Sequence, residues 1–242
     1  MREWLTARPI AHRGLHDAAS GVIENTASAF RAAIDGGYGI ECDLQISADG
    51  EAMVHHDDAL GRLTDGAGRL DTMTAEALGR IPFKASADRM MTLGELCSLV
   101  AGRAMLLIEL KGGFAGDDRL AARATEMLAG YRGPAALMSF DPGLIAAVRR
   151  LAPAVVRGLV AMRRDADSPA TQMSALRYAE QAMAARPQFL AYRVQDLTSP
   201  APRLARNVLR MPLLTWTVRT AAERQRAAAY ADQMIFEGFR PQ

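Results

Sequence analysis

Residues 39–56 read Gly39-Ile40-Glu41-Cys42-Asp43-Leu44-Gln45-Ile46-Ser47-Ala48-Asp49-Gly50-Glu51-Ala52-Met53-Val54-His55-His56. Two runs rich in β-forming residues, 39–46 and 52–56, are separated by only five residues. A parallel pair of strands needs a crossover of a dozen or more residues, so the second run must return antiparallel to the first. The pair Asp49-Gly50 favours a tight turn, because both central residues of a type I′ turn need positive φ. The stretch therefore predicts a β-hairpin.

The hairpin also predicts which polar side chains meet. With a two-residue turn at 49–50, counting outward sets Asp43 opposite His56. Because residues at i and i+2 share a face of a strand, Glu41, Asp43 and His56 are expected on one side. A turn longer or shorter by one residue places His55 there instead.

On both sides of this hairpin, short apolar runs alternate with alanine-rich helical stretches. The expected strands are Pro9–His12, Gly39–Ile46, Met105–Leu110, Ala135–Phe140, Val155–Ala161, Phe189–Val194, Leu213–Val218 and Gln233–Phe236. Helices are expected at 25–36, 92–101, 117–130, 142–152, 168–185, 200–209 and 221–230, several with N-cap signals such as Thr92 with Glu95. This order predicts an α/β fold, a closed (β/α)8 TIM barrel with a β-hairpin excursion after the second strand. An open doubly wound sheet is the alternative, but its glycine-rich GxGxxG turn does not follow the first strand.

Composition sets the class of protein. Half of the 242 residues are apolar and 23% are charged, which excludes disorder and suits one large domain spanning residues 1–242. The N-terminus has no apolar run of signal-peptide length, and no stretch has the roughly 18 apolar residues of a membrane helix. Two cysteines supply neither a disulfide framework nor a zinc site. We therefore expect a cytoplasmic protein without an integral membrane segment.

The net charge of +2 hides an uneven distribution. Residues 1–120 hold 12 basic and 18 acidic residues, a charge of −6, whereas residues 121–242 hold 17 and 9, a charge of +8. The basic half lacks the clustered runs and interleaved aromatic residues of a nucleic-acid groove. A solvated surface is the expectation there, with no nucleic-acid partner.

Three carboxylates are expected to point into the barrel, where Val, Ile or Leu is usual. Glu41 and Asp43 lie on one strand, and Glu109 lies near the end of another, two residues before Lys111. Burying carboxylates side by side is costly unless a cation lies between them. Arginine pairing is one solution. A set of oxygen ligands without cysteine is the other, and it suits one divalent cation, Mg²⁺ or Ca²⁺.

Histidine and basic residues complete the predicted site. The first strand ends in His12-Arg13-Gly14, and the carboxyl ends of parallel barrel strands share one face. His12 and His56 near a divalent cation suggest a general acid and a general base. Arg13 and Lys111 suggest an anionic substrate such as a phosphate. The residues alone thus predict metal-assisted phosphoryl chemistry.

At this point the chain resembles the glycerophosphodiester phosphodiesterase family over nearly its whole length. The resemblance rests on motifs in the family's order. They are His12-Arg13-Gly14, Glu24-Asn25-Thr26, Glu41-Cys42-Asp43-Leu44, His56-Asp57, Leu63-Thr64-Asp65-Gly66, Thr92-Leu93-Gly94-Glu95, Glu109-Leu110-Lys111, Ser139-Phe140-Asp141-Pro142 and Trp216-Thr217-Val218.

The resemblance implies a TIM barrel that hydrolyses glycerophosphodiesters to sn-glycerol 3-phosphate and an alcohol such as choline or ethanolamine. It implies one divalent metal ion on Glu41, Asp43 and Glu109, with His12 and His56 as the acid–base pair. Arg13, Lys111, Asn25 and Trp216 are the substrate-binding candidates. In this family the glycerol 2-hydroxyl is thought to attack phosphorus and leave a cyclic phosphate that water opens.

Two positions depart from the family pattern, and two other functions stay open. Arg219 follows Trp-Thr-Val where asparagine is common, and Glu237-Gly238 stands near the usual Thr-Asp turn. Both changes lie at the rim of the expected site and bear on the choice of substrate. A phospholipase D-like or lysophospholipid-cleaving enzyme is one alternative, for which a longer apolar groove is expected. A non-catalytic barrel that binds a phosphorylated ligand is the other. The leaving alcohol, the metal used in the cell and the oligomeric state are not predicted.

Overall fold

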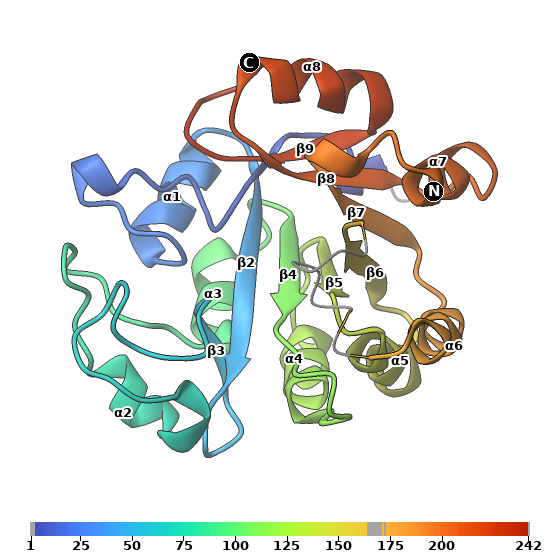
Figure 1. Cartoon of the computed structure of the whole chain (residues 1–242). Coiled ribbons are helices and arrows are strands. Elements are labelled where there is room, and N and C mark those ends of the chain that lie inside the picture. Colours follow the sequence, from blue (N-terminus) through green and yellow to red (C-terminus); the bar gives the residue numbers. More distant parts are fainter. Residues whose placement is uncertain (1–2, 164–170, 172, 242) are drawn as a thin grey trace.

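The chain is described by a computed structural model that covers residues 3–163, 171 and 173–241. Within these residues, eight parallel strands form a closed barrel, because the first strand pairs with both the second and the last. The strands are β1 (Ile10–Ala11), β2 (Gly39–Ile46), β3 (Ala52–Val54), β4 (Leu106–Leu110), β5 (Ala135–Ser139), β6 (Val156–Ala161), β7 (Phe189–Arg193), β8 (Leu213–Val218) and β9 (Gln233–Phe236). Of these strands, only β3 is antiparallel, and it lies beside the carboxyl half of β2 outside the barrel (Figure 1). The predicted TIM barrel with a hairpin after the second strand is confirmed.

Helices surround the strands (Figure 1). They are α1 (Ala27–Asp35), α2 (Ala75–Gly79), α3 (Leu93–Val100), α4 (Arg119–Ala129), α5 (Pro142–Leu151), α6 (Ala175–Ala185), α7 (Pro200–Asn207) and α8 (Ala221–Tyr230), with 3₁₀ turns at Glu3–Leu5, Ala18–Ser20, Leu70–Thr72 and Val194–Asp196. Thr92 and Thr220 cap α3 and α8 through complete capping boxes, as their sequences predict. The helix expected at 168–185 begins at Ala175, and residues 168–170 and 172 of that prediction lie outside the described residues. No helix of the described chain combines the length and apolarity needed to cross a membrane.

Strand alternation divides the core into two layers. Along β4, Leu107 packs inside the barrel, whereas Leu106, Ile108 and Leu110 pack against the surrounding helices. Glu109 therefore occupies the next inward position after Leu107, at the carboxyl end of the strand. The alternation that builds the apolar interior thus also places a carboxylate at its open end.

Inside the barrel, side chains pack tightly around Gly158. At Gly158 on β6, a Cβ atom would lie 2.4 Å from the ring of Phe189, which is fully buried. Glycine is required there because the ring fills that space. The cavity with His12, Glu41, Asp43 and Glu109 lies at the carboxyl ends of the strands.

The hairpin forms as predicted, but its register differs by one residue. Val54 pairs with Leu44, and the Ser47 amide donates to the Glu51 carbonyl, so three residues, 48–50, form the loop. Gly50 takes the left-handed φ of +83°, which three-residue hairpin loops use. The predicted pairing of Asp43 with His56 is therefore wrong, and the His55 amide donates to the Asp43 carbonyl instead.

Residues 57–92 form an excursion beside the hairpin, with a small core of its own. The excursion contains α2, which no apolar period in the sequence indicated. Its buried side chains are Leu60, Leu70, Leu78, Phe83 and Met90, packed with Met53 of β3 and with Ile23. Arg123 of α4 clamps the hairpin from its other side through two hydrogen bonds to Glu51, at 3.1 and 2.8 Å. The hairpin thus contacts both the small core of the excursion and α4.

Candidate active site

Three carboxylates meet at the carboxyl ends of β2 and β4. Asp43 and Glu109 are register partners on these neighbouring strands, and Glu41 lies two residues before Asp43. All three are buried, and each offers an oxygen within 4.8 Å of the others. The structure therefore brings together the three residues that the sequence selected as metal ligands.

Lys111 neutralises part of this charge. Its Nζ lies 2.7 Å from Asp43 Oδ1 and 2.6 Å from Glu109 Oε1. Burial favours a raised pKa for Asp43, but Lys111, His56 and Arg13 outweigh burial and hold that pKa well below its usual range. The negative charges of Glu41 and Glu109 are neutralised less completely.

The pKa values of Glu41 and Glu109 are raised, which shows that their charges are only partly neutralised. Burial raises the pKa of Glu41 well above its usual range, and repulsion from Asp43 and Glu109 adds to the rise. Burial also raises the pKa of Glu109, and Lys111 offsets only part of it. The cluster thus carries more negative charge than its protein partners neutralise, which favours a further cation.

The loop after β1 lies over the same carboxylates. The Arg13 amide donates to Glu41 Oε2 at 2.8 Å, and the Arg13 guanidinium pairs with Glu24 at 2.7 Å. Its Nε lies 3.4 Å from Asp43 Oδ2. Arg13 has a left-handed φ of 55°, so the chain turns sharply at the point where amide and side chain both reach the cluster.

Asn25 holds Asp43 from the opposite direction. The Asn25 Nδ2 donates to Asp43 Oδ2 at 2.9 Å, and the Asp43 amide donates to Asn25 Oδ1 at 3.3 Å. Thr26, the next residue, is the N-cap of α1. Both polar groups of the Asn25 side chain are therefore used to position Asp43.

Each of the two candidate catalytic histidines is paired with a carboxylate through Nδ1. His12 Nδ1 lies 2.7 Å from Glu237 Oε2, and His56 Nδ1 lies 2.8 Å from Asp57 Oδ1. The same Glu237 oxygen accepts from Arg219 at 3.1 Å, so the two positions that depart from the family pattern pair with each other. His12 Nε2 lies 4.0 Å from Glu41 Oε2.

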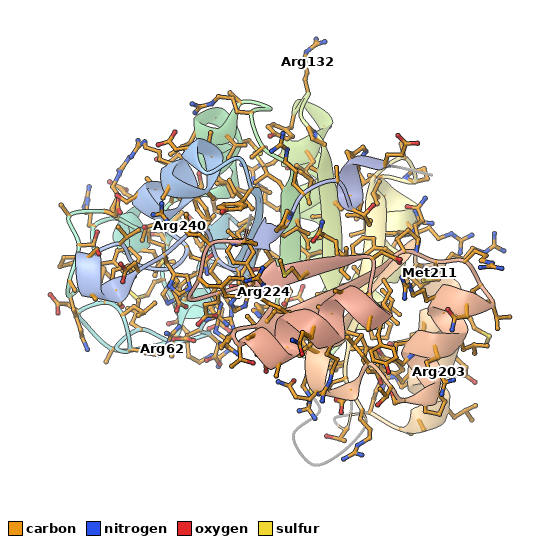
Figure 2. All side chains as sticks on the ribbon, turned by 90° about the horizontal axis from the view of Figure 1, so that it is seen from above. Arg62, Arg132, Arg203, Met211, Arg224 and Arg240 are labelled. Carbon is orange, nitrogen blue, oxygen red and sulfur yellow. The ribbon has the colours of Figure 1, made fainter. Side chains whose placement is uncertain are left out.

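The two carboxylates remain ionised around neutral pH. The hydrogen bond from His12 lowers the pKa of Glu237 to about 2, against the opposing effect of burial. Burial works against ionisation of Asp57 as well, but Arg62 and His56 lower its pKa to about 2. Arg62, labelled in Figure 2, also donates to Glu24 and so links the His56 side of the site to the Arg13 side.

His56 reaches the site although the predicted strand register was wrong. Strand pairing ends at Val54, so the two histidines lie beyond it. His55 is buried, and its ring lies 6.4 Å from that of Phe83 under the excursion. His56 instead lines the cavity that holds the carboxylates, and Gln45 holds its carbonyl at 2.8 Å.

Two cavities meet at this cluster. One of ≈250 Å³ contains His12, Arg13, the three carboxylates and Trp216. The Trp216 indole donates to the Ala191 carbonyl at 3.0 Å and packs edge-on against Phe140, with ring centroids 5.4 Å apart. The other cavity, of ≈730 Å³, extends from His56 and Lys111 toward Phe114 and Leu144.

Sequence reasoning missed the partners of the histidines. Asp57 follows His56 directly, so its proximity could have been noticed. Glu237 follows the last strand, and only the closure of the barrel between β1 and β9 brings it to His12. Another histidine of this region, His16 in the loop after β1, also has a buried Nε2.

Comparison with known proteins places this geometry in a family. The sequence pattern of the Glycerophosphoryl diester phosphodiesterase family matches residues 12–238. A glycerophosphodiester phosphodiesterase of Caldanaerobacter subterraneus is 36% identical over 112 residues, 43% of this chain and 45% of that protein. The human glycerophosphodiester phosphodiesterase 1 is 43% identical over 74 residues, 30% of this chain and 21% of that protein. The matched region thus spans less than half the length of these curated relatives.

Solved structures show the same fold over nearly the whole chain. A phosphodiesterase of Oleispira antarctica, in complex with sn-glycerol-3-phosphate, superposes with a TM-score of 0.79 at 20% identity, covering 98% of this chain and 95% of that one. A glycerophosphodiester phosphodiesterase of Thermotoga maritima gives 0.71 at 22% identity, covering 94% and 92%. With the pattern of one family matched from His12 to Gly238, the chain belongs to the glycerophosphoryl diester phosphodiesterase family.

Proposed function

We propose that the protein hydrolyses glycerophosphodiesters to sn-glycerol 3-phosphate and an alcohol, with one divalent metal ion and two histidines. One observation carries the proposal. Two imidazoles, each held at Nδ1 by an ionised carboxylate, flank a buried cluster of three carboxylates and two cationic side chains in one cavity. The product bound to the Oleispira antarctica relative supports the choice of product.

The carboxylate cluster fits a divalent cation. Its donors are carboxylate oxygens of Glu41, Asp43 and Glu109, without cysteine, which is a hard-oxygen set for Mg²⁺ or Ca²⁺. The raised pKa of Glu41 indicates unmet negative charge that such a cation would neutralise. When bound, it would supply electrostatic stabilisation of charge on the phosphoryl oxygens.

The histidine pairs determine which ring nitrogen can react. In a neutral ring, the hydrogen bond to an ionised carboxylate requires the proton on Nδ1, so Nε2 carries the lone pair. His12 then presents a basic Nε2 toward Glu41, and burial lowers its pKa and favours the neutral ring. When a ring takes a second proton, the same carboxylate stabilises the imidazolium. Either ring can therefore accept or donate a proton without changing position.

The reaction assigned to these groups has two steps. In the first, one histidine removes the proton of the glycerol 2-hydroxyl as its oxygen bonds to phosphorus. The other histidine gives a proton to the alcohol oxygen as the P–O bond breaks. In the second, water opens the cyclic phosphate with the proton transfers reversed. Arg13 and Lys111 supply positive charge to the phosphate, and we assign to Asn25 the positioning of Asp43.

The leaving-group dependence of histidine variants tests the acid–base assignment. The wild type, His12→Ala and His56→Ala are compared on glycerophosphocholine and on a glycerophosphodiester with a nitrophenol leaving group. Because nitrophenolate leaves without protonation, the variant that lacks the acid should recover most of its rate on the activated substrate, whereas the variant that lacks the base should not. Equal losses of both variants on both substrates would contradict the assignment.

The metal requirement is tested separately. Turnover of glycerophosphocholine is expected to stop in EDTA and to return with Mg²⁺ or Ca²⁺. The matched variant Glu41→Gln retains side-chain size but removes one ligand charge, and it should need more metal for half-maximal rate. Full activity of EDTA-treated protein would refute metal dependence.

The larger cavity favours a second candidate substrate, a lysophospholipid. It is continuous with the site through His56, Glu109 and Lys111. Its lining is mixed, with apolar side chains such as Phe114 and Leu144 beside charged ones such as Arg69 and Asp117. A lysophospholipid-cleaving enzyme is expected to have a longer apolar groove beside the site, and the apolar part of this lining is what supports this candidate. Lysophosphatidylcholine turned over faster than glycerophosphocholine would favour this function. The substitution Leu144→Asp should then reduce only the former rate.

A further inference from the structure

His16 lies close to His12 and Glu237. It lies in the loop after β1, where its Nε2 is buried and makes no hydrogen bond with the described residues. His12, His16 and Glu237 each present a ligand atom, and these atoms all lie within 4.8 Å of one another. The proposed reaction uses two of these residues and has no role for His16.

We propose that His12, His16 and Glu237 form a second metal site, selective for a borderline transition-metal dication such as Zn²⁺. Two imidazole nitrogens and one carboxylate are a ligand set that zinc uses in three-ligand sites. Mg²⁺ and Ca²⁺ prefer oxygen ligands only, as in the cluster of Glu41, Asp43 and Glu109. The two neighbouring sites therefore differ in donor chemistry.

The unpartnered nitrogen of His16 supports a ligand at this place. A buried polar atom without a partner is costly, and a metal ion would satisfy it. His12 Nδ1 and Glu237 Oε2 already lie 2.7 Å apart, so an ion would replace the proton between them, which is released to solvent, and the His16 ring would approach as the third ligand. His16 is in a loop rather than a strand or helix, which permits this adjustment.

Zinc binding has a consequence that rests on the proposed function. An imidazole that ligates zinc cannot transfer a proton, so occupation of this site removes His12 from acid–base chemistry. The site is then inhibitory, and it senses free zinc in the presence of saturating Mg²⁺ or Ca²⁺.

Arg219 opposes the ion. Its guanidinium lies 3.1 Å from the Glu237 oxygen, and the side chain is half exposed. Removing this positive charge should raise the affinity for the dication, because a guanidinium beside a metal ligand repels the ion. Arg219→Ala therefore provides a gain-of-affinity variant of the same site.

Metal binding itself is tested without substrate. Co²⁺ serves as a spectroscopic probe, titrated into protein saturated with Mg²⁺, with His16→Gln as the test variant and His55→Gln as a matched control. His55 is also buried with an unpartnered Nδ1, but it lies against Phe83 outside the cluster. The wild type and His55→Gln should show visible absorption from nitrogen-ligated Co²⁺, displaced by Zn²⁺. His16→Gln should bind it at least about tenfold more weakly.

A measurement on the wild type keeps the test independent of variant folding. Zn²⁺ should shift the imidazole NMR signals of His12 and His16 together, and those of His55 should stay in place. Absence of a second binding event, or equal Co²⁺ affinity in wild type and His16→Gln, would overturn the site.

The inhibitory consequence is measured by turnover. Without zinc, His16→Gln should be as active as the wild type, and it should tolerate about tenfold more Zn²⁺ at saturating Mg²⁺. Zinc inhibition that is unchanged by His16→Gln would refute the regulatory role. Loss of turnover in all variants would contradict the proposed function and leave the binding measurements standing.

Discussion

Removal of the Lys111 charge provides the sharpest test of the carboxylate cluster. Lys111 Nζ contacts Asp43 at 2.7 Å and Glu109 at 2.6 Å, and the side chain is only 19% exposed. Lys111→Met keeps the length and apolar stem of the side chain but leaves the two buried carboxylates without their shared cation. Breaking a buried pair in this way costs about 3–5 kcal/mol.

The thermal effect follows from this magnitude. For a chain of this length, each kcal/mol lowers Tm by about 2–4 °C, so metal-free Lys111→Met should melt about 6–20 °C below the wild type. A divalent cation on the same carboxylates replaces the missing charge. Saturating Ca²⁺ or Mg²⁺ should therefore raise the Tm of Lys111→Met more than that of the wild type.

The chain contains a natural control. Lys84 is the only other lysine, and its exposed side chain donates to the Gly61 carbonyl on the excursion. Lys84→Met should change the free energy of unfolding by less than about 0.5 kcal/mol. Added metal should raise its Tm as much as that of the wild type. Calorimetry in EDTA and with added metal measures all three proteins. If Lys111→Met melts with Lys84→Met in EDTA, or gains no extra stability from metal, the electrostatic reasoning is refuted.

Three other predictions test the remaining contacts. His56→Ala should lower kcat by about 10²–10⁴-fold with metal affinity nearly unchanged, and unaltered turnover would contradict its role. Glu237→Gln and Asp57→Asn should each weaken a charge-assisted hydrogen bond to a histidine, worth about 1.5–3 kcal/mol. Each substitution should therefore lower kcat about 10–100-fold with little change in KM. An effect on KM alone would argue against a role of these carboxylates in positioning the histidines. Glu51→Gln should cost about 0.2–1 kcal/mol of unfolding free energy near neutral pH. Its hydrogen bond from Arg123 lowers the Glu51 pKa against burial, so the wild-type advantage is present above the ordinary glutamate pKa and disappears as pH falls through the lowered one. Urea unfolding of both proteins near neutral pH and in acid, below the lowered Glu51 pKa, measures the difference in unfolding free energy. A difference that persists in acid would contradict the pairing of Glu51 with Arg123.

Local physics explains the parts of the fold that the sequence predicted. Buried parallel strands appear as short apolar runs, and two capping boxes marked helix starts correctly at Thr92 and Thr220. The excursion was not predicted, because α2 has five residues and no apolar period. The small core around Phe83 and Met90 is assembled from loops, which carry no periodic signal.

The hairpin shows where local reasoning reached its limit. Asp49-Gly50 is compatible with a loop of two or of three residues, since both can use a glycine with positive φ. Side-chain contacts of Ser47 with Asp49 and Glu51 accompany the longer loop. The choice shifted the register by one residue, yet His56 still reached the cavity because strand pairing ends before it.

The barrel, its hairpin and the convergence of Glu41, Asp43 and Glu109 could all be predicted from the sequence, because the alternation of strands and helices predicts the fold and the i, i+2 spacing within a strand predicts which side chains point inward. The pairing of His12 with Glu237 and of Lys111 with Asp43 depends on the folded barrel, whereas Asp57 and Glu109 are sequence neighbours of His56 and Lys111. His12 and Glu237 are 225 positions apart, and the closure of β1 against β9 joins them. Burial then sets the charge states of the cluster, because the cost of a buried carboxylate depends on every cation that the fold brings within reach.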